Sequence, residues 1–413
     1  MNEKEKTLLT PEEQERRHQV AEQRRRKARA ERARKKRRAK KIKLTIGIVF
    51  VTLLTAAAVF IITRYVLPDA GKDAQQPKTS PSEEQTSTET TQTPTTAPEP
   101  THDYPELKSK NGTFSTYSSG AIRVDNAAFS VCGTLSDSVT SKYAALVSEV
   151  ADSLNGKTKV YSLIIPTSYG VSLPDDIKTQ IANYADQGEN IAKVFSKMSE
   201  NVTPVYCYDD LMTHRDEYLY FRTDHHWNGK GAYYAYEAFC RTKGIEPFTL
   251  EKREKKEFDG FLGTMYQNNG KDENLLPADT VEAFLPISAN AAMKFTNTDG
   301  TTYDWPIVKD VSEWSSGAKY NTFAGSDNPI TEFTNPDVAD GSVLIVVKES
   351  FGNALLPYLV DHYSKIYEID YRYWKGDLVS FAEEVGADDL LFANNIMMTS
   401  TSLLVGNLSK IIK

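Results

Sequence analysis

An uninterrupted apolar run is the first strong feature of the hydrophobic pattern. Residues 44–63 contain no charged side chain. An α-helix rises 1.5 Å per residue, so about 20 apolar residues are enough to cross the hydrocarbon core of a bilayer. The small residues Ala56–Ala58 lie inside the run, and further apolar residues follow them, which argues against a cleaved signal peptide. We therefore predict an uncleaved transmembrane helix over residues 44–66.

The pattern changes twice after this run. Residues 67–103 are rich in Pro, Thr, Ser, Gln and Glu and contain no aromatic residue. Such a composition buries too little apolar surface to offset the entropy lost on ordering, so we predict a disordered extracytoplasmic linker. From Tyr104 onward the chain has the composition of a folded domain, which we predict to extend over residues 104–413.

Short apolar runs alternate with helical patterns throughout this domain. A helix begins after Asn228 and reaches about Arg241, and Gly244 ends it. The alternation predicts an α/β fold in three layers, with a mainly parallel sheet covered by helices on both faces. Strands are predicted at 121–131, 159–165, 203–206, 342–347, 365–370 and 389–393, and further helices at 137–154, 187–199, 352–362, 377–386 and beyond 393.

The segment 251–340 departs from this alternation. It is rich in Asn, Thr, Asp and Gly and carries scattered aromatic residues. Turn-forming residues at this density favour hairpins and loops over long helices. We interpret 251–340 as a loop and β insertion within the α/β domain.

Charge is divided unevenly along the chain and supports an oriented anchor. Residues 1–43 hold 18 Lys and Arg against 7 Asp and Glu, whereas the rest of the chain holds 31 against 49. A basic flank beside a transmembrane helix is typical of a cytoplasmic segment, although a nucleic-acid arm is an alternative interpretation. The acidic remainder is a poor partner for nucleic acid. We predict a single-pass plasma-membrane protein with a cytoplasmic N-terminus and an extracytoplasmic domain.

Cysteine usage points to no disulfide framework. Cys132, Cys207 and Cys240 are too few and too widely spaced for a disulfide scaffold or a zinc cluster. The sequence predicts three small core residues, with a single disulfide as the alternative.

Ser350 is a candidate nucleophile because it follows a predicted buried strand and opens a helix. At that position its hydroxyl lies at the carboxyl edge of the sheet, where α/β proteins bind ligands. The N–H groups of Ser350, Phe351 and Gly352 are then expected to be free first-turn donors for an oxyanion, and Gly352 to admit substrate close to the backbone. The alternative is that Ser350 is simply a helix N-cap.

Asp224 and His226 are a candidate acid and base for this serine. Residues i and i+2 of an extended segment point the same way, so the carboxylate can orient the imidazole. His225 is then expected at the substrate rim and Trp227 on the pocket wall. The alternatives are an Asp224 helix cap and a metal site formed by Asp224, His225 and His226. Adjacent histidines seldom bind one metal together, so the sequence favours no metal site and no cofactor.

The string Phe221-Arg222-Thr223-Asp224-His225-His226-Trp227-Asn228-Gly229-Lys230-Gly231 resembles the signature of the DHHW family, which is similar to the SGNH-hydrolase-like domains of the alginate O-acetyltransferases. The resemblance covers roughly Tyr104 to the C-terminus. It includes the strings Phe258–Thr264, Lys319–Phe323, Lys348–Asn353 and Ile369–Tyr373.

This resemblance implies particular roles. The acetyltransferases have an Asp-x-His-Trp string without a second histidine, and their acid and base fall on Asp224 and His226. Their serine, which Phe follows, falls on Ser350, and their later arginine falls on Arg372. Arg372 is thus a candidate substrate-binding residue, with a structural ion pair as the alternative. The turn containing Gly325 and Asn328 is a candidate source of an oxyanion donor, or else an ordinary turn.

The sequence therefore predicts a membrane-anchored extracytoplasmic serine enzyme with an SGNH-hydrolase-like fold. It is expected to be an O-acetyltransferase or acetylesterase that acts on a surface polysaccharide or cell-wall glycan, and a membrane-bound acyltransferase is a candidate source of the acyl group. The alternative is a non-catalytic glycan-binding protein of the same fold, with the aromatic residues of 251–340 stacking on sugars.

Overall fold

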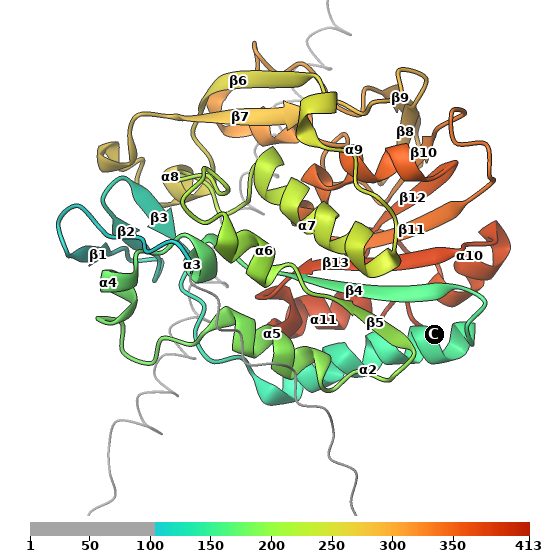
Figure 1. The fold of residues 1–413 in the computed structure, drawn as a ribbon, viewed down its shortest axis with the longest axis horizontal. Helices are drawn as coiled ribbons and strands as arrows, with labels where there is room; N and C mark the ends of the chain where they lie inside the picture. The colour runs from blue at the N-terminus through green and yellow to red at the C-terminus, as the bar shows by residue number, and fades with distance from the viewer. Residues whose placement is uncertain (1–103) are drawn as a thin grey trace, which may run out of the picture. The chain divides into compact units, whose positions relative to one another are not determined.

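Continuous apolar runs form the central strands of an eight-stranded sheet (Figure 1). The structure is a computed structural model that describes residues 104–413. In spatial order the strands are β5 (Val202–Val205), β4 (Lys159–Ile165), β13 (Asp389–Asn395), β11 (Val343–Lys348), β12 (Lys365–Asp370), β10 (Ile330–Thr334), β8 (Ala292–Thr296) and β9 (Thr302–Trp305). The first five run parallel, and the last three are antiparallel. The predicted α/β fold with a mainly parallel sheet is thus confirmed.

Helices cover both faces of the sheet, which gives three layers. Alternate residues of β4 enter different cores, with Ile164 in one and Leu163 in the other. The first core is closed by α2 (Asp137–Leu154), α5 (Gln187–Phe195), α10 (Leu378–Val385) and α11 (Ser402–Leu408). The second is closed by α6 (Tyr208–Thr213), α7 (Gly229–Lys243) and α9 (Leu356–Leu359). Strands that are buried on both faces explain why their sequences are apolar without alternation.

Helix α7 begins and ends where its capping residues predict. The Asn228 side chain accepts hydrogen bonds from the N–H groups of Lys230 and Gly231 at 2.9 and 3.1 Å. Gly244 closes the helix with a φ of 78°, a left-handed conformation that glycine adopts without steric cost. The cap fixes the start of α7 directly after the Asp224–Trp227 string.

Segment 251–340 supplies β8, β9 and β10, which extend the central sheet, and the separate antiparallel pair β6 (Lys255–Phe261) and β7 (Asp279–Phe284). It also forms the short helix α8 (Thr264–Asn268) and the 3-10 helix η3 (Ser316–Thr322). Both short helices contact the Asp224–Trp227 string, so this segment helps to build the candidate site.

Several predicted elements differ from the observed ones. The strand predicted at 121–131 is two short strands, β2 (Ile122–Val124) and β3 (Ala127–Phe129), because Asp125 turns the chain with a φ of 49°. They pair with β1 (Phe114–Thr116) in a small antiparallel sheet. The helix predicted at 352–362 is three short pieces, η4 (Ser350–Ala354), α9 and η5 (Val360–His362). Other short helices are α3 (Ser168–Val171), α4 (Asp175–Lys178), η1 (Leu250–Lys252), η2 (Glu273–Leu275) and η6 (Met398–Ser400).

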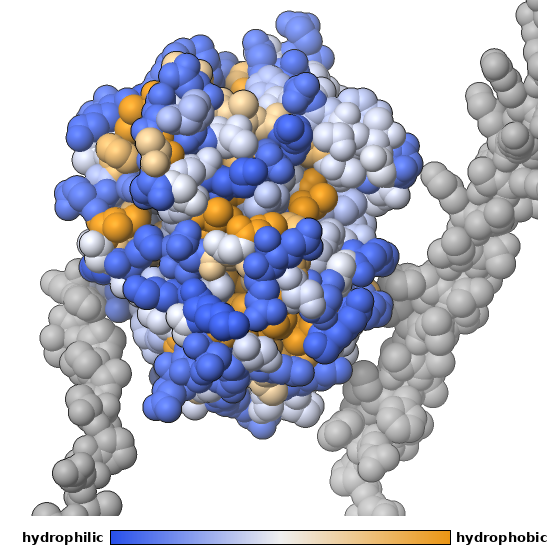
Figure 2. Space-filling view, turned by 90° about the vertical axis from the view of Figure 1, so that its right-hand side faces the viewer, coloured by the Kyte–Doolittle hydropathy of each residue, from blue (hydrophilic) through white to orange (hydrophobic). Residues whose placement is uncertain are grey.

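The predicted basic segment 1–43, transmembrane helix 44–66 and linker 67–103 lie outside the described residues. Among residues 104–413, no helix combines the length and apolar character needed to cross a bilayer. Figure 2 shows polar residues covering most of one side of this domain, with smaller apolar areas between them. Cys132, Cys207 and Cys240 are buried free thiols, as the sequence predicts for core residues.

Candidate active site

The loop between Leu219 and Asn228 folds back on itself and fixes the Asp224 and His226 side chains. The Phe221 N–H donates to the His226 carbonyl at 3.2 Å, and the Asn228 N–H donates to the Leu219 carbonyl at 2.9 Å. Inside this loop, Asp224 Oδ1 accepts the His226 N–H at 3.0 Å. The carboxylate and the imidazole are therefore held together by the backbone itself.

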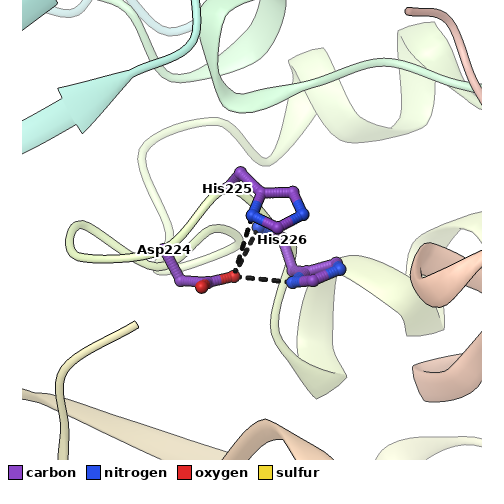
Figure 3. Close-up of side chains that lie close together, drawn as sticks. All are labelled: Asp224, His225 and His226. Carbon is purple, nitrogen blue, oxygen red and sulfur yellow. Dashed lines mark hydrogen bonds and ion pairs between the residues drawn. The ribbon is translucent and has the colours of Figure 1, made fainter. Parts of the chain in front are cut away.

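Asp224, His226 and Ser350 form a continuous hydrogen-bonded chain. His226 Nδ1 lies 2.6 Å from Asp224 Oδ1, a contact drawn as a dashed line in Figure 3, and His226 Nε2 lies 2.7 Å from Ser350 Oγ. A carboxylate accepts hydrogen bonds, so Nδ1 carries the proton and Nε2 accepts from the serine hydroxyl. In this arrangement His226 Nε2 is placed to accept the proton of the Ser350 hydroxyl.

Asp224 is buried and fully provided with donors. Its Oδ2 accepts from the Thr264 N–H at 2.6 Å and from Thr264 Oγ1 at 2.9 Å. Burial works against the charged carboxylate, but the charges of His226 and His225 and these hydrogen bonds outweigh it, and the pKa of Asp224 falls well below its usual value. A Cβ on Gly263 would lie 2.3 Å from Asp224 Oδ2, so only glycine fits beside the carboxylate.

Tyr320 forms the floor beneath His226. The two rings stack at a centroid distance of 4.0 Å and an interplanar angle of 9°. The Tyr320 hydroxyl donates to the Ser350 carbonyl at 2.9 Å, so a single side chain contacts both the base and the serine backbone. Trp227, predicted on the pocket wall, has 0% exposure and donates from Nε1 to the Phe351 carbonyl at 2.9 Å. It supports the site from the core and is too deeply buried to line a pocket.

The turn around Ser350 is held by Glu349, a buried residue that the sequence reasoning did not single out. Glu349 Oε2 accepts the Phe351 N–H at 3.2 Å, and the Glu349 carbonyl accepts the Gly352 N–H at 2.9 Å. Glu349 Oε1 in turn accepts the backbone N–H and the side-chain amide of Asn395, each at 2.9 Å. Two of the three predicted oxyanion donors are therefore occupied. The Ser350 N–H is the first-turn donor that none of these bonds uses.

Gly352 is required for packing within the protein. A Cβ at this position would lie 2.6 Å from Lys348 Cβ, and the residue is buried. The missing side chain therefore faces Lys348, which explains the glycine without a close approach of substrate to the backbone.

Arg372 forms ion pairs with two carboxylates. Its Nε lies 2.9 Å from Asp370 Oδ1, and its Nη2 contacts Asp370 Oδ2 at 2.5 Å and Asp327 Oδ2 at 2.9 Å. Burial disfavours the guanidinium charge, but these two partners raise the pKa of Arg372 above its usual value. The side chain is 21% exposed. Arg372 thus makes a structural ion pair, and its role as a substrate ligand stays a prediction.

A buried cluster of charges lies below Arg372 at the ends of β11 and β12. Lys348 Nζ is 2.7 Å from Glu368 Oε1, 3.5 Å from Asp327 Oδ1 and 3.8 Å from Asp370 Oδ2. The registers of β11 with β12 and β13 bring Lys348 beside Asp370 and Ala393. Ser350 and Arg372 therefore follow the ends of neighbouring strands, and Asn395 is the last residue of β13. The carboxyl edge of the parallel sheet is where such folds gather their ligands.

Gly325 and Asn328 lie in the loop that carries Asp327. The Asn328 side-chain amide donates to the Gly325 carbonyl at 2.9 Å, and Gly325 has a φ of 68°. The amide thus stabilises its own turn, and a role for either residue as an oxyanion donor stays a prediction.

His225 lies beside His226 with a ring-centroid distance of 3.8 Å, and its side chain is 37% exposed. Burial and the neighbouring His226 charge lower the pKa of His225 to about 4, so its imidazole is neutral at pH 7. The structure places it at the outer side of the triad, and its role at the substrate rim stays a prediction.

Asp224, His225 and His226 also offer one potential metal ligand each, with the ligand atoms within 4.8 Å of one another. A metal there would have to displace the proton that joins His226 Nδ1 to Asp224 Oδ1 at 2.6 Å. The three residues are coupled by hydrogen bonds in the manner of an acid–base pair, which favours proton transfer over metal binding.

The fold and the site together define an α/β protein with a serine, histidine and aspartate aligned at the carboxyl edge of a mainly parallel sheet. A family model described as DHHW protein matches residues 106–369, and the chain belongs to the DHHW family. A comparison with curated proteins finds no match.

Two solved structures show the extent of the similarity. A DHHW family protein from Eubacterium siraeum is 26% identical with a TM-score of 0.63, covering 71% of this chain and 95% of that one. PatB1 of Bacillus cereus, solved with a sulfonyl adduct, is 15% identical with a TM-score of 0.57, covering 73% of this chain and 99% of that one. At that identity the likeness to PatB1 concerns the fold alone.

Sequence reasoning missed Thr264, Tyr320, Glu349 and Asp327 as parts of the site. Thr264 and Tyr320 lie within strings that carried the family resemblance, and Glu349 directly precedes Ser350. These strings were the available signal, but their contacts with the triad join segments far apart in the sequence.

Proposed function

We propose that the domain is a serine acyl-ester enzyme, an O-acetyltransferase or acetylesterase. The observation that carries this proposal is the hydrogen-bonded chain from Ser350 Oγ through His226 to Asp224, with distances of 2.7 and 2.6 Å. A serine that only caps a helix does not require a hydrogen bond to an imidazole. An aspartate with a purely structural role does not require a histidine that links it to a serine. The chain matches the requirement of nucleophilic catalysis, in which a base removes the serine proton and a carboxylate orients the base.

The chemistry proceeds in two steps. Ser350 Oγ attacks the ester carbonyl carbon as its proton moves to His226 Nε2, and the leaving alcohol takes that proton. The acyl–Ser350 ester is then attacked by water or by a sugar hydroxyl, which passes its proton to His226. The bond to Ser350 breaks and the serine regains a proton. The Ser350 N–H supports the developing oxyanion.

A sulfonyl fluoride tests this proposal without requiring the natural substrate. An activated serine attacks the sulfur and expels fluoride, which leaves a stable sulfonyl ester. PatB1 has been solved with a sulfonyl adduct, which supports the choice of reagent. We expect intact-mass spectrometry to find one sulfonyl group on the full-length protein, and peptide mapping to locate it on Ser350. Ser350→Ala should remain unlabelled, and labelling of the wild type at other residues only would refute the proposal.

The proposed substrate is a cell-surface glycan, and the proposed location is the outer face of the plasma membrane. The apolar run 44–66 and the basic residues before it support the anchor, and a membrane-bound acyltransferase is the proposed source of the acyl group. Protease treatment of intact cells should release a fragment that begins within 67–103. Release of the domain only after lysis would contradict this topology.

The alternative is a glycan-binding protein without catalysis. Of the aromatic residues in 251–340, Phe258, Phe261, Tyr320 and Phe323 are core residues with exposures of 1–6%. Tyr303 and Trp314 are the more exposed ones, at 45% and 36%. These two side chains leave a small stacking surface, so the structure favours the enzyme. Sugar binding that persists in a wild type unreactive toward the sulfonyl fluoride would favour the alternative.

A further inference from the structure

Asp224 is hydrogen bonded toward two imidazoles. One oxygen, Oδ1, holds His226, and the other, Oδ2, accepts from Thr264 Oγ1 at 2.9 Å. The same Thr264 hydroxyl lies 2.6 Å from His225 Nδ1. Two hydrogen-bond paths, or branches, therefore begin at the Asp224 carboxylate. One leads to His226 and on to Ser350, and the second leads through Thr264 to His225.

The second branch fixes the proton on His225. A threonine hydroxyl has a single proton, and here it is donated to the Asp224 carboxylate. Thr264 Oγ1 must then accept from His225, so His225 Nδ1 carries the proton. A neutral imidazole with a proton on Nδ1 has an unprotonated Nε2, which is a hydrogen-bond acceptor. The lowered pKa of His225, about 4, keeps it in this neutral form at pH 7.

The accepting nitrogen faces the reacting side of the site. Figure 3 shows the outer nitrogens of His225 and His226 turned to the same side, away from Asp224. The outer nitrogen of His226 is the one that reaches Ser350 Oγ. The His225 side chain is 37% exposed whereas that of His226 is 7% exposed, so His225 is the more accessible of the two to an incoming molecule.

The geometry points to His225 Nε2 as a subsite for the acyl acceptor, where it accepts a hydrogen bond from a hydroxyl that neighbours the reacting one. The inference rests on the proposed function and narrows the acceptor to a vicinal diol, the arrangement found on sugar rings. His225 is thus a specificity-determining residue, and Thr264 is a positioning residue that acts through it.

The transfer step balances without any additional reactant. The reacting hydroxyl oxygen bonds to the acyl carbon, its proton moves to His226 Nε2, and the bond from that carbon to Ser350 Oγ breaks. The proton then returns to Ser350 Oγ. The neighbouring hydroxyl keeps its own proton throughout and donates a hydrogen bond to His225 Nε2, which orients the acceptor.

Two small acceptors that differ by one hydroxyl test the subsite. The full-length protein is given 4-nitrophenyl acetate together with either trans-1,2-cyclohexanediol or cyclohexanol, and acetylated product is measured against free acetate. We expect the diol to be acetylated in preference to cyclohexanol. His225→Phe keeps a ring but removes the accepting nitrogen, and should reduce this preference roughly three- to tenfold, the size of one neutral hydrogen bond.

Matched variants at Thr264 separate positioning from general damage. Thr264→Ser keeps the hydroxyl and should retain the diol preference. Thr264→Val loses the hydroxyl that fixes the His225 proton and should reduce the preference as His225→Phe does. Because each value is a ratio of two acceptors on one enzyme, a general loss of acylation cancels.

Three outcomes would overturn the inference. They are an equal preference in wild type and His225→Phe, a Thr264→Val variant that behaves as Thr264→Ser, and a wild type that acetylates neither alcohol while releasing nitrophenol. Failure of the proposed function is distinguishable from all three, because the wild type would then lack the sulfonyl adduct on Ser350.

Discussion

Asp224 and Glu368 are two buried carboxylates of the domain, and they are stabilised in opposite ways. Asp224 accepts hydrogen bonds from His226 and Thr264, and its pKa lies well below the usual value. Glu368 has one ion pair within residues 104–413, to Lys348, and burial raises its pKa to about 7. Two equally buried carboxylates therefore behave differently. Asp224, which has several hydrogen-bond donors, stays charged, whereas Glu368, which has few, titrates near neutral pH.

The largest expected effect is at Asp224, the carboxylate with several hydrogen-bond donors. Asp224→Asn removes the charge and favours the wrong His226 tautomer, so the rate of 4-nitrophenyl acetate turnover should fall about 10³- to 10⁴-fold, as in serine-protease triads. Thermal unfolding serves as the control for a retained fold. A loss below tenfold in a folded variant would remove Asp224 from the catalytic machinery.

At Glu368, the carboxylate with few donors, Lys348→Met should affect the stability of the fold more than the rate of ester turnover. The change removes the one ion-pair partner that Glu368 has within residues 104–413, whereas Asp370 and Asp327 keep Arg372. A buried charge left without its partner costs about 3–5 kcal/mol in the free energy of unfolding. Denaturant titration measures the loss. Lys365→Met is the matched control, because Lys365 lies on β12 and forms a 3.6 Å pair with Glu332 at 37% exposure. Its loss should stay below about 1 kcal/mol.

Gly263→Ala tests how closely the protein packs around the Asp224 carboxylate. The new Cβ would meet Asp224 Oδ2 at 2.3 Å, so the carboxylate must shift from its present position beside His226. A displacement of about 1 Å in a catalytic group can cost on the order of 10²-fold in rate. Gly317→Ala is the control, since the nearest atom to its Cβ would be 3.6 Å away. Similar rates for the two variants would show that Asp224 tolerates displacement.

The smallest effect is the pH dependence of stability. The folded pKa of Glu368, about 7, exceeds its ordinary value of 4.5, so its contribution is present below pH 4.5 and is lost as the pH rises to 7. Compared with Glu368→Gln, the wild type should lose about 1–3 kcal/mol of unfolding free energy between pH 5 and pH 8. Asp224 has the opposite sign, and its contribution is lost on acidification. An identical slope for wild type and Glu368→Gln would contradict this account.

The same contrast explains what the sequence could predict. Asp224 and His226 are two residues apart, and Ser350 follows a buried apolar strand, so local spacing and strand pattern suffice to nominate them. The Lys348–Glu368 pair depends on the register of β11 with β12, and the Asp224–Thr264 contact joins residues 40 positions apart. No local pattern reports such pairings. The helix predicted at 352–362 was wrong in form, because a run of apolar residues does not reveal three short turns around Pro357.

Through Glu349, the turn that carries Ser350 depends on Asn395, a residue that is synthesised later in the chain. The base is synthesised 124 residues before the serine, and β13, which carries Asn395, is synthesised later still. Asn395 clamps the Glu349 carboxylate that shapes the Ser350 turn. A nascent chain with all three reactive groups but without a docked β13 therefore lacks this clamp. Under the proposed function, the Ser350 turn therefore reaches its full set of hydrogen bonds only after residues 389–395 have been synthesised and β13 has docked.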